Sequence, residues 1–257
     1  MKSGIQCTFR SFIAFSLAFS VHPAIEGQTA LDFFKVTAFN DKKEGMTRQE
    51  FMDYSTKTHV PLVLEMPGLR GYVLNFALPD DEAAPHDAVV ELWFDSEEDF
   101  AKAMESEEGQ RALADAPNFM KMPVQTMAVD EVIMVYPATQ EEQPSNGYKA
   151  TYIAQRNPDI SWEEYQLIQL KDYAPIVNGF ENIGGYVINF SKKDDATLPA
   201  SAVVHVWFED NATATKAFQS PNLKKIGELQ ERMLAEAPKS MLVREYVAMA
   251  PPVYPEK

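Results

Sequence analysis

A chain of 257 residues, 46% hydrophobic and 24% charged, is long enough for two globular domains that each bury a core of their own. Its formal net charge of −15 argues against nucleic acid and anionic membrane surfaces as partners, because both repel an acidic protein. No apolar run in the sequence reaches the roughly 20 residues that a membrane-spanning helix needs.

The amino terminus has the features of an export signal. Lys2 and Arg10 precede an apolar run from Phe12 to Val21, and a polar stretch follows. This order is typical of a signal peptide, so we expect residues 1–24 to be removed and the protein to be periplasmic or secreted. The alternative is an amino-terminal helix that packs on the first domain. Removal of the signal would take away Cys7, the single cysteine, and with it any thiol chemistry.

The rest of the chain reads as two copies of one unit. A shift of 114 positions superimposes the sequence on itself without a gap, and it places Lys35 on Lys149. The hexapeptide at 71–76 (GYVLNF) then falls on the one at 185–190 (GYVINF). Such an internal repeat indicates a duplicated module. We expect modules at residues 30–137 and 148–257, joined by a polar, proline-bearing linker at 138–147.

Within each copy the predicted order is strand, helix, strand, strand, helix, strand. Apolar patterning predicts strands at 33–39, 69–77, 87–95 and 125–135, and again at 148–154, 183–191, 201–209 and 239–249. The first helix of each copy opens with a capping box, Thr47-x-x-Glu50 and Ser161-x-x-Glu164. The second helical segment spans 96–114 in copy one and 212–235 in copy two. This is the ferredoxin-like α+β fold, whose open sheet face the other copy can cover.

Strand periodicity sorts the side chains between the two faces of each sheet. An apolar set in the third strands is expected under the helices: Ala88, Val90, Leu92 and Phe94, with Ala202, Val204, Val206 and Phe208. The opposite face gives the candidate substrate-binding residues Asn75, Glu91, Trp93, Asn189, His205 and Trp207. An apolar wall with a few polar groups is typical of a small-molecule pocket, here between the two sheets. The alternative is a dry core between the sheets in which neighbours satisfy the polar groups.

Several motifs of the first copy resemble the EthD family of the dimeric α/β-barrel superfamily. They are the segments 59–62 (HVPL), 67–73 (PGLRGYV) and 87–95 (DAVVELWFD). The second copy keeps the skeleton but has Tyr173 where the first has His59. The resemblance implies that the two modules pair as an intramolecular dimeric α/β barrel. It also implies a part in the oxidative breakdown of small organic molecules, without defining a reaction.

His59 is the candidate catalytic residue. It lies near the end of the first predicted helix, where Pro61 should kink the backbone. Pro175 repeats the kink in the second copy, but the histidine is not repeated. With an ordinary pKa of about 6.5, a histidine at a pocket mouth could act as a general base. The alternative is a partly exposed histidine on a helix flank.

The common cofactor and nucleophile signatures are absent from the sequence. It has no dinucleotide or P-loop motif, no serine-hydrolase elbow and no cysteine cluster. Four histidines make a histidine-rich metal site improbable, so no metal is expected. No cofactor is evident, although a single axial histidine could hold haem.

These observations predict an exported EthD-like protein that binds a small apolar or aromatic molecule between its two sheets. Its chemistry would be oxidoreductase-like, or an isomerisation or dehydration. The alternatives are a non-catalytic module that binds or delivers such a molecule, and a structural protein with a dry core. We expect a monomer whose copies pair internally, or a higher oligomer, with neither a nucleic-acid partner nor, once the signal is removed, a membrane partner.

Overall fold

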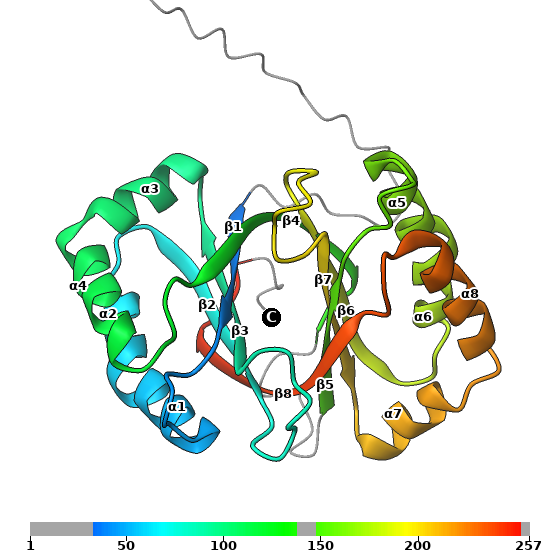
Figure 1. Cartoon of the computed structure of the whole chain (residues 1–257), viewed down its shortest axis with the longest axis horizontal. Coiled ribbons are helices and arrows are strands. Elements are labelled where there is room, and N and C mark those ends of the chain that lie inside the picture. The colour runs from blue at the N-terminus through cyan, green and yellow to red at the C-terminus, as the bar shows by residue number, and fades with distance from the viewer. Residues whose placement is uncertain (1–32, 138–147, 253–257) are drawn as a thin grey trace, which may run out of the picture.

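The computed structural model describes residues 33–137 and 148–252, and its two halves share one order of elements (Figure 1). The expected signal peptide and linker lie outside the described residues. The first half contains β1 (Phe34–Asn40), α1 (Arg48–Tyr54), η1 (Ser55–His59), α2 (Val60–Leu64), β2 (Leu69–Ala77), β3 (Ala88–Phe94), α3 (Glu97–Glu105), α4 (Glu107–Asp115), η2 (Ala116–Asn118) and β4 (Gln125–Val135). The second half contains β5 (Tyr148–Ala154), α5 (Trp162–Leu167), η3 (Ile168–Tyr173), α6 (Ala174–Asn178), β6 (Ile183–Ser191), β7 (Ala202–Phe208), α7 (Asn211–Phe218), α8 (Leu223–Met233) and β8 (Lys239–Met249).

The eight strands close into one antiparallel barrel in the order β1-β3-β2-β8-β5-β7-β6-β4. Each half alone is a ferredoxin-like sheet with its last strand beside its first. Two pairings join the halves: β2 with β8, and β4 with β6. Because both edges of each sheet are thereby paired, the barrel has no free edge strand. The predicted fold, two ferredoxin-like modules closed into a barrel within one chain, is confirmed.

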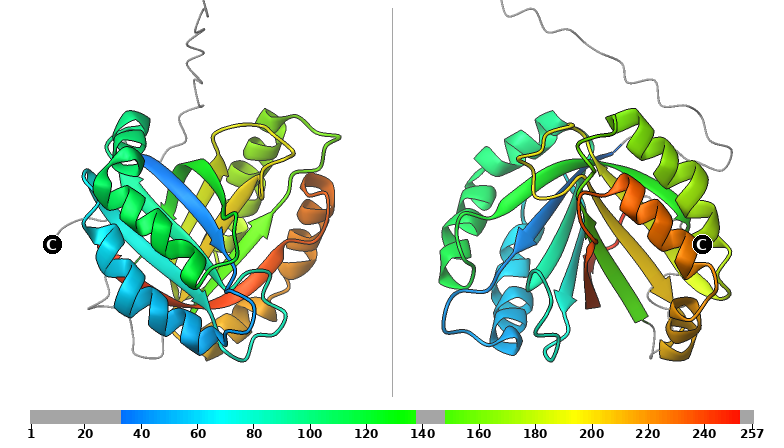
Figure 2. Two further views of the ribbon diagram at one scale, coloured as in Figure 1. Left: turned by 60° about the vertical axis from the view of Figure 1, so that its left-hand side comes forward. Right: turned by 45° about the vertical axis from the view of Figure 1, so that its right-hand side comes forward.

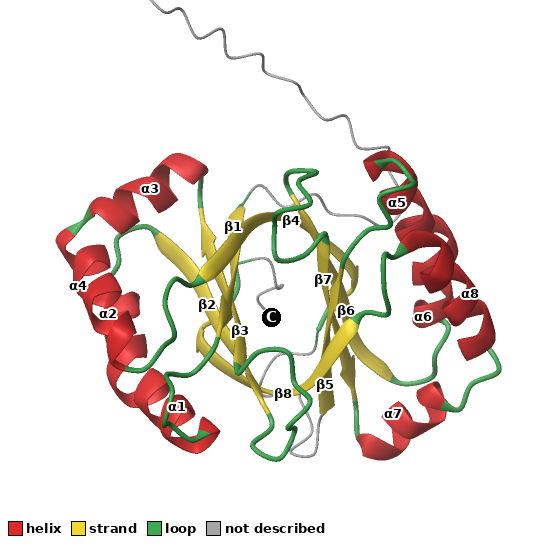
Figure 3. Cartoon of the chain, viewed as in Figure 1, coloured by secondary structure: helices red, strands yellow, loops and turns green. Residues whose placement is uncertain are grey.

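The helices cover only the outside of the barrel, with α1–α4 on one side and α5–α8 on the opposite side (Figures 2 and 3). Within the described residues, no helix combines the length and apolar character needed to span a bilayer. The barrel wall is therefore formed by strands, and each half has a separate helix–sheet interface.

Local sequence explains where the first helices begin and how they bend. Thr47 and Glu50 form the full capping box, whereas Ser161 only accepts from the Glu164 amide. The Glu164 carboxylate pairs instead with Arg232 of α8, 3.0 Å away. The bend predicted at Pro61 and Pro175 takes the form of a π-helical turn, η1 or η3, just before each proline. A π turn shifts the backbone hydrogen bonds, which accommodates the missing proline N–H.

The predicted assignment of strand faces is confirmed. Under the helices, each half has an apolar core that contains its expected set, for example Val90 and Phe94 in the first half and Val204 and Phe208 in the second. The alternate residues point into the barrel, where valines, Met127 and Met241 fill part of the space. Phe39, Ile133 and Ile153 also point inward. The polar and charged inward side chains, together with the two tryptophans, make up the first candidate site.

Candidate functional site

All six predicted substrate-binding residues lie inside the barrel and are almost fully buried. Asn75, Asn189 and His205 are at most 1% exposed, and Glu91 is 3% exposed. They share the interior with charged residues that were not singled out from the sequence: Lys35, Glu131, Lys149 and Glu245. The signal was present, because the same charged residues recur at equivalent strand positions of both copies.

A lysine, a glutamate and a tryptophan interact in the same way in each half. Lys35 Nζ pairs with Glu131, whose other oxygen accepts from Trp93 Nε1 at 3.2 Å. In the second half, Lys149 Nζ lies 2.6 Å from Glu245 Oε1, and Trp207 Nε1 lies 3.4 Å from Glu245 Oε2. Each ammonium also sits over its tryptophan ring, 4.2 Å and 4.0 Å from the centroid. Because the partners compensate for burial, the pKa of Lys35 is raised despite its loss of solvent.

Glu91 and His205 stand at equivalent positions and meet across the barrel. His205 Nε2 lies 3.1 Å from Glu91 Oε1, off the line of an ideal hydrogen bond, and His205 Nδ1 lies 3.0 Å from the Thr151 hydroxyl. Glu91 Oε1 is also 2.6 Å from Lys35 Nζ. Burial lowers the pKa of His205 to about 4 against the opposing effect of Glu91, so the imidazole is neutral at neutral pH. Burial disfavours ionised Glu91, but His205 and Lys35 together hold its pKa well below the usual range.

The two inward asparagines differ in their hydrogen bonds, because the first half has Glu91 where the second half has His205. Asn75 Nδ2 donates to Glu91 Oε2 and to the Val89 carbonyl, both at 3.0 Å. Asn189 is equally buried, yet neither of its amide atoms has a hydrogen-bond partner. The histidine at position 205 has no carboxylate oxygen to accept from Asn189, so Asn189 lacks the contact that Asn75 makes with Glu91.

His59, the predicted catalytic residue, lies elsewhere, in the helical layer of the first half. It ends η1, and its Nδ1 is 3.0 Å from Asp115 Oδ2. The other oxygen of Asp115 accepts from the Tyr54 hydroxyl at 2.8 Å. The ring packs on Phe119, with centroids 4.8 Å apart, and burial lowers its pKa despite the nearby carboxylate. A neutral imidazole oriented by a carboxylate suits a base, but His59 does not approach the six barrel residues.

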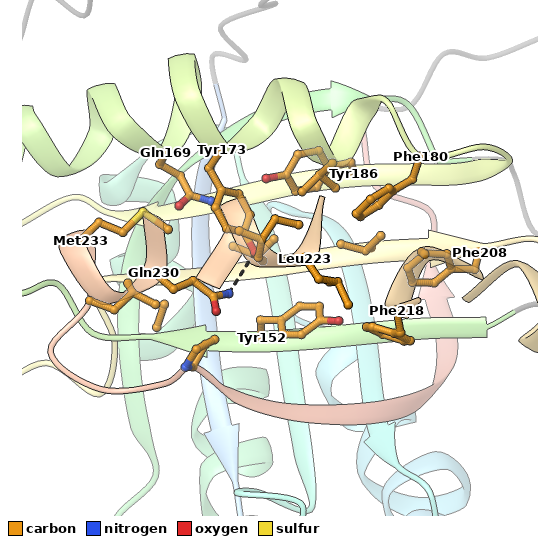
Figure 4. A pocket seen from close by; sticks show the side chains of 18 residues that line it. Tyr152, Gln169, Tyr173, Phe180, Tyr186, Phe208, Phe218, Leu223, Gln230 and Met233 are labelled. Carbon is orange, nitrogen blue, oxygen red and sulfur yellow. Dashed lines mark hydrogen bonds between the residues drawn. The ribbon is translucent and has the colours of Figure 1, made fainter. Parts of the chain in front are cut away.

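A cavity of about 180 Å³ lies in the second half, between the sheet and the helices. Its wall combines Tyr152, Tyr173, Tyr186, Gln169 and Gln230 with apolar residues such as Val204, Phe208, Phe218, Ile226 and Met233 (Figure 4). Among the described residues, none that lines it is acidic, basic or histidine. The cavity therefore favours an uncharged, mainly apolar ligand.

Polar atoms in the cavity wall come from tyrosines and glutamines. Gln230 Nε2 donates to the Tyr173 hydroxyl at 3.1 Å (Figure 4). The Tyr186 hydroxyl is buried beside Gln169 without a well-aligned hydrogen bond. Burial raises the pKa of Tyr186 well above its usual range, so the phenol stays protonated and is a donor.

This cavity is not predicted from the sequence, because strand periodicity places apolar residues under the helices and does not show whether they fill the space. One available signal was the change at π-turn positions, where Ser55 and His59 of the first copy become Gln169 and Tyr173. Gln169 and Tyr173 are larger than Ser55 and His59, and they are polar although they face an apolar sheet. Such residues are consistent with the wall of a cavity rather than a packed core.

Comparison with known proteins finds a family match within the first half of the chain. Residues 43–123 match the sequence profile of the EthD domain. The first half of the chain carries an EthD domain. The match includes α1 to η2 with His59 and Asp115, whereas the cavity lies in the second half, outside the matched EthD residues. No curated protein matches the chain in sequence.

Solved structures share the fold of the whole described chain, on both sides of the EthD match. An anthrone oxidase-like protein has a TM-score of 0.63 and 12% identity, covering 86% of this chain and 96% of that one. A candidate monooxygenase from Fusobacterium nucleatum subsp. nucleatum has a TM-score of 0.58 and 14% identity, covering 89% of this chain and 99% of that one. A second candidate monooxygenase, from Lactobacillus acidophilus, has a TM-score of 0.56 and 10% identity, covering 87% of this chain and 99% of that one. At these identities the likeness establishes the dimeric α/β-barrel fold alone.

Proposed function

We propose that the cavity of the second half binds a small, uncharged aromatic molecule that carries a hydrogen-bond-accepting oxygen. The observation that carries this proposal is the Tyr186 hydroxyl, a buried donor without a well-aligned partner at an otherwise apolar wall. A buried donor left unpaired costs about 1–3 kcal/mol, which a ligand oxygen would recover. A cavity of about 150 Å³ is known to hold benzene, so a space of about 180 Å³ fits one substituted ring.

We further propose that the protein acts in the oxidative metabolism of this molecule. The EthD domain and the likeness to proteins described as monooxygenase or anthrone oxidase-like support this role. Because no lining residue is acidic, basic or histidine in the part of the chain described, the wall supplies no obvious proton acceptor. Oxidation would then rely on an electron-rich ligand and a separate oxidant such as dioxygen. The same observation favours the second candidate, a module that binds or delivers the molecule without turnover.

Binding is tested with a matched pair of probes, acetophenone and ethylbenzene, which differ in one carbonyl oxygen. Tyr186→Phe should weaken acetophenone binding by about tenfold, the value of one buried hydrogen bond, and leave ethylbenzene unchanged in calorimetric or NMR titrations. His59→Ala, in the other half, is the control that should alter neither affinity. Equal losses for both probes, or no binding of either by the wild type, would contradict the proposal.

Oxygen uptake then separates the two candidate functions. Turnover of an electron-rich aromatic probe that disappears in Tyr186→Phe supports an enzyme, and binding without oxygen consumption supports a carrier. His59 does not line this cavity, so turnover of a ligand bound there should persist in His59→Ala. Loss of turnover with retained binding would instead place the reaction near His59.

A further inference from the structure

Most inward side chains of the two halves match, and the exception that changes charge lies at the centre. Matching pairs are Lys35 and Lys149, Thr37 and Thr151, Asn75 and Asn189, Trp93 and Trp207, and Glu131 and Glu245. The exception is Glu91, whose equivalent is His205. The register shows the equivalence, because Thr37 is opposite Glu91 and Thr151 is opposite His205.

Glu91 and His205 also meet each other across the interior, where Glu91 lies 4.0 Å from Lys149 of the second half as well. They come from β3 and β7, which lie on opposite sides of the eight-stranded ring and are not neighbours in the sheet. Their side chains nevertheless approach to 3.1 Å, and both residues are at most 3% exposed. A residue at this position therefore meets its equivalent in whichever module completes the barrel.

We propose that the Glu91–His205 contact makes the two halves unlike partners, so that the first half closes its barrel on a second half and not on another copy of itself. The partner is a second half of this chain, whether from the same molecule or from another copy. This inference is independent of the proposed ligand cavity, which lies outside the barrel.

Like pairings would lose the favourable central contact. Two first halves would bring two carboxylates together, and two buried carboxylates at this distance cannot both ionise. The interior would then hold two lysines against four glutamates. Two second halves would bring two imidazoles together and would remove the carboxylate that now contacts Lys35 and Asn75. The first mismatch is the more costly one, since it adds buried negative charge.

The full-length chain allows each like contact to be created separately. His205→Glu places Glu opposite Glu, and Glu91→His places His opposite His. The double variant E91H/H205E restores an unlike pair with its members exchanged. Because the polar residues and tryptophans around the pair repeat, the exchanged pair finds the same lysine, threonine, asparagine and tryptophan around each member, which makes it a closely matched control.

Denaturant unfolding of these variants tests the proposal. H205E should raise the unfolding equilibrium constant roughly 100-fold or more, E91H should raise it roughly tenfold, and the double variant should return to within about tenfold of wild type. A double variant that loses as much as the two single variants combined would overturn the proposal, and so would an H205E chain as stable as wild type.

The pH dependence distinguishes the central contact from general damage to the core. The deficit of H205E should shrink below pH 5, because one carboxyl can take a proton, whereas the deficit of E91H should grow as both imidazoles become charged. Lys35, Lys149, Glu131 and Glu245, the other charged groups facing this pair, are present in all four proteins. Parallel pH profiles for the two single variants would therefore overturn the proposal.

Discussion

Single residues inside the barrel show how a protein retains charges that burial disfavours. Taking a carboxylate or an ammonium out of water costs several kcal/mol, and only close partners offset that cost. Glu131 and Glu245 each have a lysine and an indole N–H, and Glu91 has Lys35 and Asn75. With His205 neutral, two lysines face three glutamates, so the interior carries one uncompensated negative charge.

Because of His205, the fold should become less stable at mildly acidic pH. Its pKa is about 4 in the folded state and about 6.5 in an unfolded chain, so the unfolded state binds the proton more readily. The His205 contribution is therefore complete above pH 6.5 and is lost as pH falls from 6.5 to 4. The free energy of unfolding should drop by about 3 kcal/mol over that window, beside a smaller loss from His59, whose pKa is also lowered.

Denaturant unfolding from pH 7.5 to 4 measures this prediction, with His205→Gln as the comparison. Unfolding of the variant should take up one proton fewer than unfolding of the wild type. The part of the pH dependence that comes from His59 should remain. A wild type whose stability is flat between pH 6.5 and 4.5 would show that burial does not disfavour the charged imidazole.

The inward positions are predictable from the sequence, but the ion pairs that the inward side chains form are not. Alternation along each strand is enough to place Asn75, Glu91 and Trp93 on one face. Their partners come from other strands, such as Lys35 in β1 and Glu131 in β4, and pairing across strands is a property of the closed barrel. Local periodicity carries no information about which charges meet, so a network of ion pairs could not be distinguished from a ligand pocket.

At the scale of elements, the helix–sheet interface of the second half contains a cavity, whereas aromatic rings pack together at the corresponding place in the first half. Phe119 follows η2 and packs on Phe51, Tyr54 and His59, with ring centroids 4.8–5.6 Å apart. Its equivalent in the second half is Met233, which lines the cavity. One aromatic residue in place of a methionine therefore accounts for part of the difference.

Met233→Phe should place an aromatic ring in the cavity of the second half, at the position that Phe119 occupies in the first half. Cavity filling commonly stabilises by about 0.5–2 kcal/mol, which for a chain of this size raises the melting temperature by about 2–4 °C per kcal/mol. Acetophenone binding should weaken at least tenfold, because the ring occupies ligand space. Phe119→Met is the matched control, and it should destabilise by about 1–3 kcal/mol without changing that affinity. A Met233→Phe protein that binds acetophenone as well as wild type would place the ligand elsewhere.

Elements were predictable from sequence where a local rule governs them. All eight strands lie within one residue of their predicted bounds, because period-two patterning and turn residues mark them. The first helices were predicted to kink at Pro61 and Pro175, but the π turns were not, since a π turn also depends on how the helix packs on its sheet. The cavity depends on the summed volume of side chains from seven elements, which no single segment encodes.

At the scale of the whole molecule, the two halves share one hydrogen-bonded sheet. β2 pairs with β8 from Tyr72 to Ala77, and β4 pairs with β6 from Val129 to Val135. Separating the halves would expose four strand edges and the charged interior together. Neither half can therefore keep its native surroundings when the other unfolds.

The chain should consequently unfold in one cooperative transition, although it is built from two modules. Differential scanning calorimetry should show a single heat-absorption peak whose calorimetric and van't Hoff enthalpies agree. Phe119→Met in the first half and Met233→Phe in the second should each move the whole peak, in opposite directions. Two resolved peaks, with each substitution moving only one of them, would mean that the modules are stable separately. In that case the paired edges and the central Glu91–His205 contact would contribute little to holding the barrel closed.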